Sequence, residues 1–461
     1  MNKIFDNIGV VEHYIFKYKD NFIFMDVHTL DVYILDEFEN KIIKVLNKSY
    51  EDDELNKLIA TFGEKAVSEK TDELLNNGVL KLNKEKKGVD PDKCLDDLAT
   101  LKIINSMVIL ISEDCNLACK YCYVKNGQYQ GKSDLMDLDV GKKSIDFIIE
   151  RSEKQKNLFV YFFGGEPLIN FKVLKDIVIY ALKEGEKNDK HFHFSLTTNG
   201  TLFNDEIIDF VEKHTITVVM SIDGDKNAHN FNRPLSGGGD SYTQVVNNLE
   251  KLDQRKINCS ARVTVSSLTI NQIAENFEHL ISLGFKKIHF GNALAPKGKM
   301  FINKEDQIKE IIKQYSLISK KINENILSGQ SFILGSIPLP LERIDTKRTI
   351  SYPCEAGRKY IAVDVKGDLY LCHRLVGEQT FILGNVIDGT FNSHWAKIIQ
   401  NEMSVDDRKI CRTCWARHIC GGGCFAINYD FNKDISLTPS VYCQLKKHSI
   451  KLALTTFVYA P

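Results

Sequence analysis

The sequence predicts an α/β protein with a parallel sheet at its centre, preceded by a small α+β unit and followed by a cysteine-rich unit. Three observations support this fold class. Six strand-like segments alternate with helical patterns between residues 101 and 300, which is the pattern of a parallel sheet with crossover helices. An aromatic and β-branched stretch precedes three helical patterns in residues 1–83. Seven of the 12 cysteines lie after residue 350.

Residues 1–83 predict a small winged-helix-like α+β module. The stretch 12–35 is rich in aromatic and β-branched residues and is broken by KDN and HTLD, which is typical of two or three short antiparallel strands. Three segments with apolar residues at three-to-four spacing follow, which is typical of amphipathic helices, at residues 36–49, 50–63 and 64–78. Residues 84–100 are expected to form a charged linker.

Residues 101–300 predict the sheet itself. Its strand-like runs are 101–112, 157–164, 191–200, 215–224, 258–266 and 286–292. Six β-then-α units are too few to close an eight-stranded barrel, so we expect an open, partial (β/α)6 TIM-like barrel with its chemistry at the C-terminal ends of the strands. Residues 301–349 are typical of a helical connector. Residues 350–461 have few long periodic segments, so we expect ligands to organise them more than an apolar core does.

Composition argues against several classes of partner. The formal net charge of the 461 residues is −1, which gives no electrostatic reason to expect nucleic acid or a membrane surface as the partner. No apolar stretch reaches the ~18–20 residues that span a bilayer, and the N-terminus lacks the apolar core of a signal peptide. We therefore expect a cytoplasmic protein. In that reducing compartment, cysteines favour metal or cluster ligation over disulfides.

Three cysteines follow the first predicted strand of the sheet. Cys115, Cys119 and Cys122 lie in the stretch SEDCNLACKYCYVKNG, residues 112–127. A CxxxCxxC loop can wrap three thiolates around one face of a cuboidal [4Fe–4S] cluster, which leaves one iron without a protein ligand. An open iron implies an exogenous ligand, as an open position does at catalytic zinc. The alternative is a structural zinc site with a distant fourth cysteine.

This loop resembles the signature of the radical S-adenosylmethionine (SAM) superfamily. The resemblance implies that SAM chelates the open iron, that an electron from the cluster cleaves SAM, and that the resulting 5′-deoxyadenosyl radical abstracts a hydrogen from the substrate. GGEP at 164–167, TNG at 198–200 and SIDG at 221–224 follow in order at predicted strand ends. For the last two motifs, and for Arg262, the alternative is a purely structural role. The SAM-binding residues that the resemblance implies are Tyr121, Gly164, Gly165, Glu166, Pro167, Asn199, Ser221 and Arg262.

The C-terminal cysteines form a second array, with the spacing C-x12-G-x4-C followed by C-x2-C-x5-C-x3-C and a final cysteine. This array resembles the SPASM domain of radical SAM peptide-modifying enzymes, which holds two auxiliary [4Fe–4S] clusters, and would bring the total to three clusters. A zinc ribbon is the alternative. The resemblance assigns Cys354, Cys372 and Cys424 to an inner cluster nearer SAM, and Cys411, Cys414, Cys420 and Cys443 to an outer cluster.

The inner set is one cysteine short. Two fully ligated clusters need eight cysteines, whereas the array supplies seven. Sulfatase-maturing relatives have another cysteine in the stretch that matches 355–371, where this sequence has none. We therefore expect an open iron or an unusual ligand, while Cys94 and Cys259 are either plain thiols or the missing ligand. An open iron near the radical can bind a substrate thiolate and hold it for bonding to a carbon radical.

The residues after Cys372 favour this chemistry. The CHRxxGE stretch resembles that of thioether-forming peptide maturases of the SCIFF, ranthipeptide and sactipeptide types. Sulfatase-maturing enzymes instead have an acidic residue after the cysteine, which serves as a base. His373 is a candidate catalytic base or hydrogen-bond donor near the inner cluster, with a structural histidine as the alternative.

The first module resembles the RiPP recognition element, a PqqD-like winged-helix fold of enzymes that modify ribosomally synthesised peptides. An exposed strand edge can accept an extended leader peptide by β-augmentation. The candidate edge is the strand around 30–35, with Leu30, Val32 and Ile34 as leader-binding residues. A winged helix can also bind DNA, but here acidic residues match the lysines closely.

These motifs together predict a radical SAM maturase that makes thioether crosslinks in a cysteine-containing precursor peptide, with a flavodoxin or ferredoxin as the external electron donor. The alternatives are a carbon–carbon crosslink, the oxidation of a protein residue, or a non-catalytic peptide-binding or electron-transfer protein. Electron carriers do not need a GGEP motif, which counts against the last of these. The sequence leaves open the acceptor residue, the carbon attacked, the number of crosslinks, the peptide and the oligomeric state.

Overall fold

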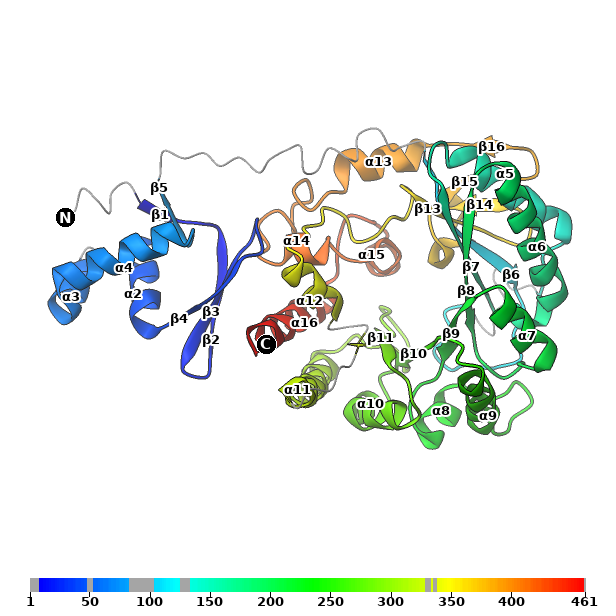
Figure 1. Ribbon diagram of the computed structural model, residues 1–461, viewed down its shortest axis with the longest axis horizontal. Coiled ribbons are helices and arrows are strands. Elements are labelled where there is room, and N and C mark those ends of the chain that lie inside the picture. The colour runs from blue at the N-terminus through cyan, green and yellow to red at the C-terminus, as the bar shows by residue number, and fades with distance from the viewer. Residues whose placement is uncertain are drawn as a thin grey trace.

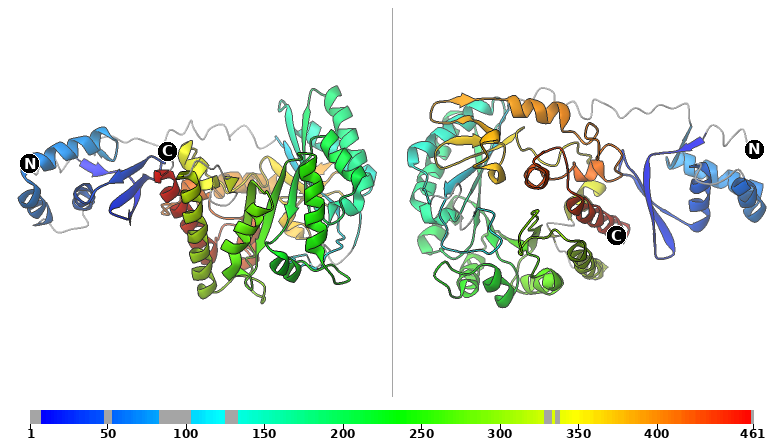
Figure 2. Two further views of the ribbon diagram at one scale, coloured as in Figure 1. Left: turned by 60° about the horizontal axis from the view of Figure 1, so that its bottom comes forward. Right: turned by 180° about the vertical axis from the view of Figure 1, so that it is seen from behind.

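The computed structural model describes residues 8–47, 53–82, 103–124, 133–327, 333–334 and 338–459. Figure 1 shows an elongated molecule, with the N-terminal unit at one end, the large sheet at the other and most of the cysteine-rich part between them. The two views in Figure 2 keep this order. Cys94 and the predicted linker at 84–100 lie outside the described residues.

Residues 8–82, here called the front unit, contain the strands and helices that the sequence predicts. An antiparallel sheet has the order β2-β3-β4 and is followed by three helices. A capping box begins the first of these helices, because Asp36 and Glu39 accept each other's backbone N–H. The elements are β1 (Ile8–Val10), β2 (His13–Tyr18), β3 (Asn21–Asp26), β4 (Val32–Leu35), α2 (Glu37–Leu46), α3 (Asp53–Phe62), α4 (Glu64–Asn76) and β5 (Leu80–Leu82), with β1 paired to β5.

The antiparallel sheet of the front unit is buried on both faces. Phe24 and Leu35 pack with the unit's own helices, whereas Ile23 and Met25 join the core of the main body. All four are at most 3% exposed. Strands β3 and β4 contact α16 (Ser440–Tyr459), the last helix of the chain. Because side chains alternate between the two faces of a strand, β3 joins the two cores.

The central sheet has eleven strands in the order β12-β11-β10-β9-β8-β7-β6-β13-β14-β15-β16. The six strands from β6 to β11 pair in parallel, as predicted, and a helix follows each of them. The strands are β6 (Ser106–Ser112), β7 (Asn157–Gly164), β8 (His191–Thr198), β9 (Thr217–Ser221), β10 (Cys259–Val265), β11 (Lys287–Asn292) and β12 (Ile333–Leu334). The helices are α5 (Leu138–Arg151), α6 (Phe171–Lys187), α7 (Asp205–Lys213), α8 (Lys226–Asn232), α9 (Ser241–Gln254), α10 (Ile273–Ser282) and α11 (Glu305–Leu327).

The cysteine-rich part continues this sheet, which the sequence did not predict. Its first strand pairs in parallel with β6, and three short antiparallel strands follow. We expected ligands to organise this part more than an apolar core does, yet Leu369, Tyr370 and Phe381 are at most 1% exposed. The strands are β13 (Tyr360–Val363), β14 (Asp368–Tyr370), β15 (Ile382–Asn385) and β16 (Thr390–Phe391).

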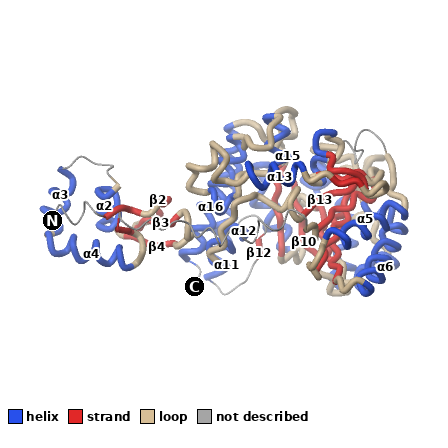
Figure 3. The backbone as a smooth tube through the Cα atoms, turned by 90° about the horizontal axis from the view of Figure 1, so that it is seen from above, coloured by secondary structure: helices blue, strands red, loops and turns tan. Residues whose placement is uncertain are grey.

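The two faces of the parallel sheet differ. Helices such as α5 and α6 cover one face, where Val160 and Phe162 of β7 are fully buried (Figure 3). Tyr161 lies between them on the opposite face and is 37% exposed. Register places Ser221 of β9 beside Arg262 of β10 on that same side. We call the side that carries Tyr161, Ser221 and Arg262 the open face.

The remaining helices complete the body. The predicted helical connector contains α11 and α12 (Pro338–Asp345), and both pack against α16. The cysteine-rich part adds α13 (His394–Glu402), α14 (Arg417–Cys420) and α15 (Phe425–Asn432). Among the helices in the described ranges, none combines the length and the apolar character needed to cross a bilayer.

Candidate functional site

The first three thiols lie together after β6. Burial, and then the charges of Glu166, Cys119 and Cys122, raise the pKa of Cys115 to about 12. A tight turn connects the last two thiols, because the Cys122 amide donates to the Cys119 carbonyl at 3.0 Å. Charges affect one another's pKa in this way only at short range. The three side chains therefore form one group, as the CxxxCxxC spacing predicts.

A buried ion pair supports this loop. The Tyr121 hydroxyl donates to Asp223 at 2.5 Å, and the Arg233 Nε lies 3.0 Å from the same carboxylate oxygen. The other oxygen of Asp223 accepts the Thr264 amide at 2.9 Å. The Arg233 charge favours the Cys119 thiolate, although burial still raises the pKa of Cys119 to about 11. Tyr121 therefore positions the loop through Asp223.

Glu166 of the GGEP motif is fully buried and holds two strand ends together. Its carboxylate accepts the Thr198 hydroxyl at 2.7 Å, the Asn199 amide at 2.6 Å and the Leu168 amide at 3.0 Å. Burial raises its pKa to about 7 even though these hydrogen bonds lower it. A carboxylate has about four lone-pair sites, so one remains for another donor.

Gly164 explains why this motif begins with glycine. Its φ is +139°, and a Cβ atom there would lie 2.2 Å from the Ser112 carbonyl oxygen. The same carbonyl accepts the Gly165 amide at 2.8 Å. Only glycine allows β7 to end this close to β6. Pro167 follows at the start of a short 3-10 helix.

Asn199 reaches the cysteine loop. Its Nδ2 donates to the Asn116 Oδ1 at 2.8 Å and lies 3.9 Å from the Cys115 sulfur. Its Oδ1 accepts from both the amide and the hydroxyl of Thr201. The side chain is therefore hydrogen-bonded within the protein on both ends.

Arg262 and Ser221 are neighbours on the open face. Gly291 of β11 makes room for the arginine, since a Cβ atom there would lie 2.6 Å from the Arg262 Nη2. In the described part of the chain, no carboxylate lies within ion-pair distance of Arg262. The Arg262 side chain is exposed to solvent. The open face thus holds an exposed guanidinium that can take an anion.

A second group of thiols lies on the other side of the site, at Cys354, Cys372 and Cys424. Burial, and then the charges of Cys424 and Cys354, raise the pKa of Cys372 to about 12. His373 hydrogen-bonds through Nδ1 to the Tyr360 hydroxyl at 2.7 Å. Burial lowers the pKa of His373 to about 3, so the imidazole is neutral.

The third group lines one cavity of about 50 Å³, formed by Cys411, Cys414, Cys420 and Cys443. Burial, and then the charges of the other three thiols, raise the pKa of Cys443 to about 11. The seven C-terminal cysteines therefore lie in two sets, with the members that the family resemblance implies. No three His, Cys, Asp or Glu side chains in the described ranges converge on one metal ion. A cuboidal cluster takes one thiolate per iron. The set of four thiols therefore fits a fully ligated cluster, and the set of three fits a cluster with one iron open.

The GGG stretch at 421–423 bends the chain around a buried arginine. Arg408 donates to the Gly421 and Gly422 carbonyls at 2.9 and 2.6 Å. A Cβ atom on Gly422, whose φ is +91°, would lie 1.2 Å from the Arg408 Nη2. These contacts place Cys420 and Cys424 on either side of the bend.

Cys259 lies apart from all three groups. It packs against the main apolar core and lies on the same helix-covered face of β10 as Ala261 and Val263. Burial raises its pKa to about 12. The structure therefore makes Cys259 a packed thiol and leaves the inner group with three described cysteines.

The three candidate leader-binding residues differ in their exposure to solvent. Leu30 is 1% exposed, has a φ of 60° and packs into the main core before β4 begins. Val32 is half-buried, whereas Ile34 is 53% exposed. Within the described residues, β4 pairs with β3 alone and is an edge strand. The accessible edge therefore carries Val32 and Ile34 but not Leu30, which is a correction to the expected set.

Three residues that support the site, Asp223, Arg233 and Tyr360, were not predicted from the sequence. Asp223 belongs to the SIDG motif, and an aspartate at a buried strand end is a usable signal that we left unassigned. Arg233 and Tyr360 carry no local signal, because their partners Asp223 and His373 come from distant segments.

The sequence matches two families over most of these elements. Residues 109–283 match the Radical SAM superfamily, and residues 354–415 match SPASM, an iron-sulfur cluster-binding domain. The chain is an enzyme that carries a radical SAM domain followed by a SPASM domain. The first match runs from β6 to the end of α10, and the second covers β13 to β16 and part of the cysteine array.

Curated relatives of the enzyme act in different ways. A cysteine-type anaerobic sulfatase-maturating enzyme of Clostridium perfringens is 25% identical over 362 residues, which cover 75% of this chain and 95% of the relative. The radical SAM cyclopropyl synthase TigE of Paramaledivibacter caminithermalis is 26% identical over 244 residues, which cover 47% of this chain and 49% of TigE.

Solved structures share the fold of the enzyme. Native anSMEcpe with bound AdoMet, which is SAM, has 25% identity and a TM-score of 0.65, and the match covers 77% of this chain and 98% of that chain. Streptococcus suis SuiB bound to the precursor peptide SuiA has 14% identity and a TM-score of 0.55, with 94% and 99% covered. The part of this chain that lies outside the match to SuiB is much shorter than the front unit. Most of the front unit therefore belongs to the fold that the two proteins share.

Proposed function

We propose that the enzyme installs thioether crosslinks in a ribosomally synthesised precursor peptide, joining a substrate cysteine sulfur to a backbone or side-chain carbon. SAM and three [4Fe–4S] clusters would be its cofactors. Cys115, Cys119 and Cys122 would hold the SAM cluster. The inner auxiliary cluster would be held by Cys354, Cys372 and Cys424, and the outer one by Cys411, Cys414, Cys420 and Cys443.

One observation carries the thioether assignment, namely the three-thiol inner group. Cys259 packs on the helix-covered face of the sheet, so it is remote from this group. A cluster held by three thiolates keeps one iron for another ligand, and a coordinating thiol is deprotonated by its metal. A substrate cysteine is the ligand that this vacancy suits best.

Residues around the first cluster would position SAM. Glu166 keeps one lone pair for the ammonium group, and Arg262 offers an unpaired guanidinium to the carboxylate. Tyr121 would hold the cluster loop through Asp223. Ser221 lies beside Arg262, where it can meet the ribose. The remaining members of the set are Gly164, Gly165, Pro167 and Asn199.

The crosslink must remove two hydrogens from the peptide. One S–H bond and one C–H bond break, and one C–S bond forms. When bound, SAM and the clusters would supply the hydrogen-abstracting radical and accept the remaining electron. The Tyr360 hydroxyl holds His373 through its Nδ1, and we propose that His373 acts as a base or as a hydrogen-bond donor beside the inner cluster.

The front unit would bind the leader as a RiPP recognition element of winged-helix type. The free edge of β4, with Val32 and Ile34, supports this role because an edge strand can pair with an extended peptide. We further propose that the parallel sheet curves into an open partial barrel. A cytoplasmic flavodoxin or ferredoxin would supply the reducing electron.

The decisive experiment uses the anaerobically reconstituted enzyme and the peptide encoded beside its gene. Without peptide, the reduced enzyme should cleave SAM to 5′-deoxyadenosine. With peptide, mass spectrometry should show a loss of two hydrogens per crosslink and one fewer alkylated thiol for each. If the mass falls while every thiol still alkylates, thioether formation is wrong.

That last outcome would support a second function. The match covers 95% of the sulfatase-maturating relative, and TigE is a cyclopropyl synthase. Both favour oxidation of a residue or carbon–carbon bond formation. Fragmentation that places the mass change on residues other than cysteine would establish this alternative.

A further inference from the structure

A groove between α2 and α3 lies on the front unit, on the side away from the catalytic body. Figure 1 shows these two helices at the end of the molecule opposite the large sheet. The groove has a volume of about 200 Å³, below the range of about 300–1,000 Å³ that is usual for small-molecule sites. It therefore suits a few side chains of a peptide better than a whole small molecule.

The floor of the groove is apolar. Val45 contributes from α2, and Leu58 and Phe62 contribute from α3. Leu58 is 5% exposed and shapes the floor, whereas Phe62 is 36% exposed. A partly exposed ring at the end of a groove can cover an inserted apolar side chain.

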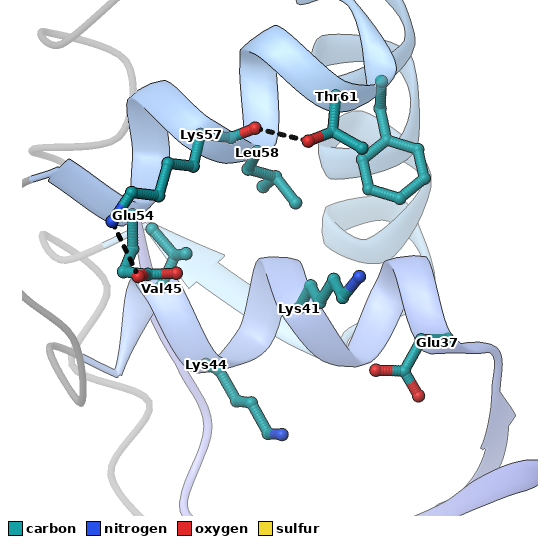
Figure 4. Close-up of a pocket in the computed structure, with 9 residues that line it drawn as sticks. Glu37, Lys41, Lys44, Val45, Glu54, Lys57, Leu58 and Thr61 are labelled. Carbon is teal, nitrogen blue, oxygen red and sulfur yellow. Dashed lines mark hydrogen bonds and ion pairs between the residues drawn. The ribbon is translucent and has the colours of Figure 1, made fainter.

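Three lysines and two glutamates also line the groove, and Figure 4 labels all five. Lys57 pairs with Glu54 at 3.4 Å. Lys41 and Lys44 instead lie over aromatic rings, 5.5 Å from the Phe62 centroid and 6.0 Å from the Phe22 centroid. Neither has an ion-pair partner among the residues that the structure describes. Two ammonium groups beside an apolar floor form a site that complements a carboxylate next to an apolar side chain.

The groove also lies near the candidate leader edge. Helix α2 begins two residues after β4 ends at Leu35, and Lys41 and Lys44 are six and nine residues beyond it. At 1.5 Å per helical residue this is about 9–14 Å, which about three to four extended residues can span. A peptide paired with β4 can therefore reach the groove.

We propose that this groove binds an acidic segment of the precursor peptide, with carboxylates at Lys41 and Lys44 and an apolar side chain over Leu58 and Phe62. The inference rests on the proposed peptide-modifying function and specifies the chemistry of the peptide. Glu37 and Glu54 also line the groove, and Lys57 pairs with Glu54. The groove therefore offers places for single carboxylates at Lys41 and Lys44, and not the continuous positive surface that the closely spaced phosphates of a nucleic acid require.

Fluorescence anisotropy with synthetic probes tests the proposal on the reconstituted full chain. The probes are three labelled decapeptides, one of alternating glutamate and leucine, one with lysine for glutamate, and one with serine for leucine. We expect the first probe to bind at least tenfold more tightly than the other two. In the Lys41→Glu/Lys44→Glu variant, its Kd should rise at least tenfold.

Two further variants make the result specific. Lys65→Glu/Lys81→Glu makes the same charge change on exposed parts of α4 and β5 and should leave binding within twofold. Phe62→Ser should weaken the first probe, and circular dichroism checks that the unit stays folded without the stack of Phe62 on Phe38, whose centroids lie 4.2 Å apart. Equal binding by the groove and control variants, or by the leucine and serine probes, would overturn the proposal.

The same variants separate this proposal from the proposed function. Peptide-independent SAM cleavage should be unchanged in all of them, because α2 and α3 lie at the end of the molecule opposite the large sheet (Figure 1). If the groove variants bind the probe normally while thioether formation proceeds, only the groove proposal fails. If the wild-type enzyme cleaves SAM neither with nor without peptide, the proposed function fails.

Discussion

The Tyr14 ring of the front unit stacks on the Trp415 indole, with centroids 3.6 Å apart and planes 4° from parallel. Trp415 directly follows Cys414 of the outer thiol group. Two residues later, Arg417 makes two hydrogen bonds of 2.6 Å to Glu12. The front unit is thus attached to the loop that would hold the outer cluster, which connects the proposed leader-binding unit to the cofactor region.

Removing this stack should loosen the front unit without affecting the radical chemistry. An aromatic pair contributes about 0.5–1.5 kcal/mol beyond its buried area, so Tyr14→Ala should raise the KM for the full-length peptide several-fold. Peptide-independent SAM cleavage should keep its wild-type rate, and Lys65→Ala on α4 provides the surface control. An unchanged KM would show that the stack does not position the peptide.

The Asp223–Arg233 pair should be costly to break from one side. Asp223→Asn leaves Arg233 as a buried charge without its partner, which costs about 3–5 kcal/mol. Tyr121→Phe removes only one hydrogen bond to the same carboxylate and should cost about 1–3 kcal/mol. Urea unfolding of both variants measures the difference, and an equally small loss in each would contradict this account of the ion pair.

Gly422 should tolerate no side chain. Its φ of +91° and the 1.2 Å approach of the Arg408 Nη2 predict that Gly422→Ala disrupts the loop between Cys420 and Cys424. Iron bound per chain should then fall. The matched control is Gly389→Ala, which has a φ of +72° but no atom within 4 Å of the added Cβ, and should cost only about 1–2 kcal/mol. Equal iron in both variants would contradict this prediction.

Thiol removal should distinguish cluster ligands from packed cysteines. Under the three-cluster proposal, Cys424→Ala should lower the iron content by up to about four atoms per chain. Cys259→Ala should keep full iron content and lose only the stability expected for a small core cavity, about 1–2 kcal/mol. A loss of iron in Cys259→Ala would make that thiol a ligand and remove the vacancy on which the thioether proposal depends.

Asp364 should make stability depend on pH. It is 1% exposed, one of its carboxylate oxygens has no hydrogen bond, and burial raises its pKa to about 6. An unfolded aspartate has a pKa of about 3.9. Because the folded state favours the protonated form, its contribution to stability falls as the pH rises from about 4 to 6 and stays lower above that range.

The amide variant should therefore be more stable at high pH. Asp364→Asn keeps the oxygen that accepts the Lys366 and Asp368 amides but carries no charge. It should exceed wild-type stability by up to about 3 kcal/mol at pH 8, with the advantage gone at pH 4. Urea unfolding at the two pH values measures this, and a pH-independent difference would rule out the titration of Asp364 as its cause.

Much of the fold was predictable because it depends on local pattern. Strand-like apolar runs located the six strands from β6 to β11, and turn glycines such as Gly164 marked where strands end. The sheet extension from β6 to β13 was not predictable, because Tyr360–Val363 is a short apolar run without a helical crossover beside it. The burial of Leu30 was missed for a related reason, since its face of the sheet meets a helix from the far end of the chain.

By itself, the sequence determined the order of the elements and the first thiol group, because periodicity and the CxxxCxxC spacing are local properties. Only the tertiary structure decided that Cys259 faces away from the inner group, that Arg233 neutralises Asp223, and that Glu12 meets Arg417 across 405 positions. Those contacts join segments whose local sequences do not indicate that they meet. They form only when burial of the shared core brings the segments together.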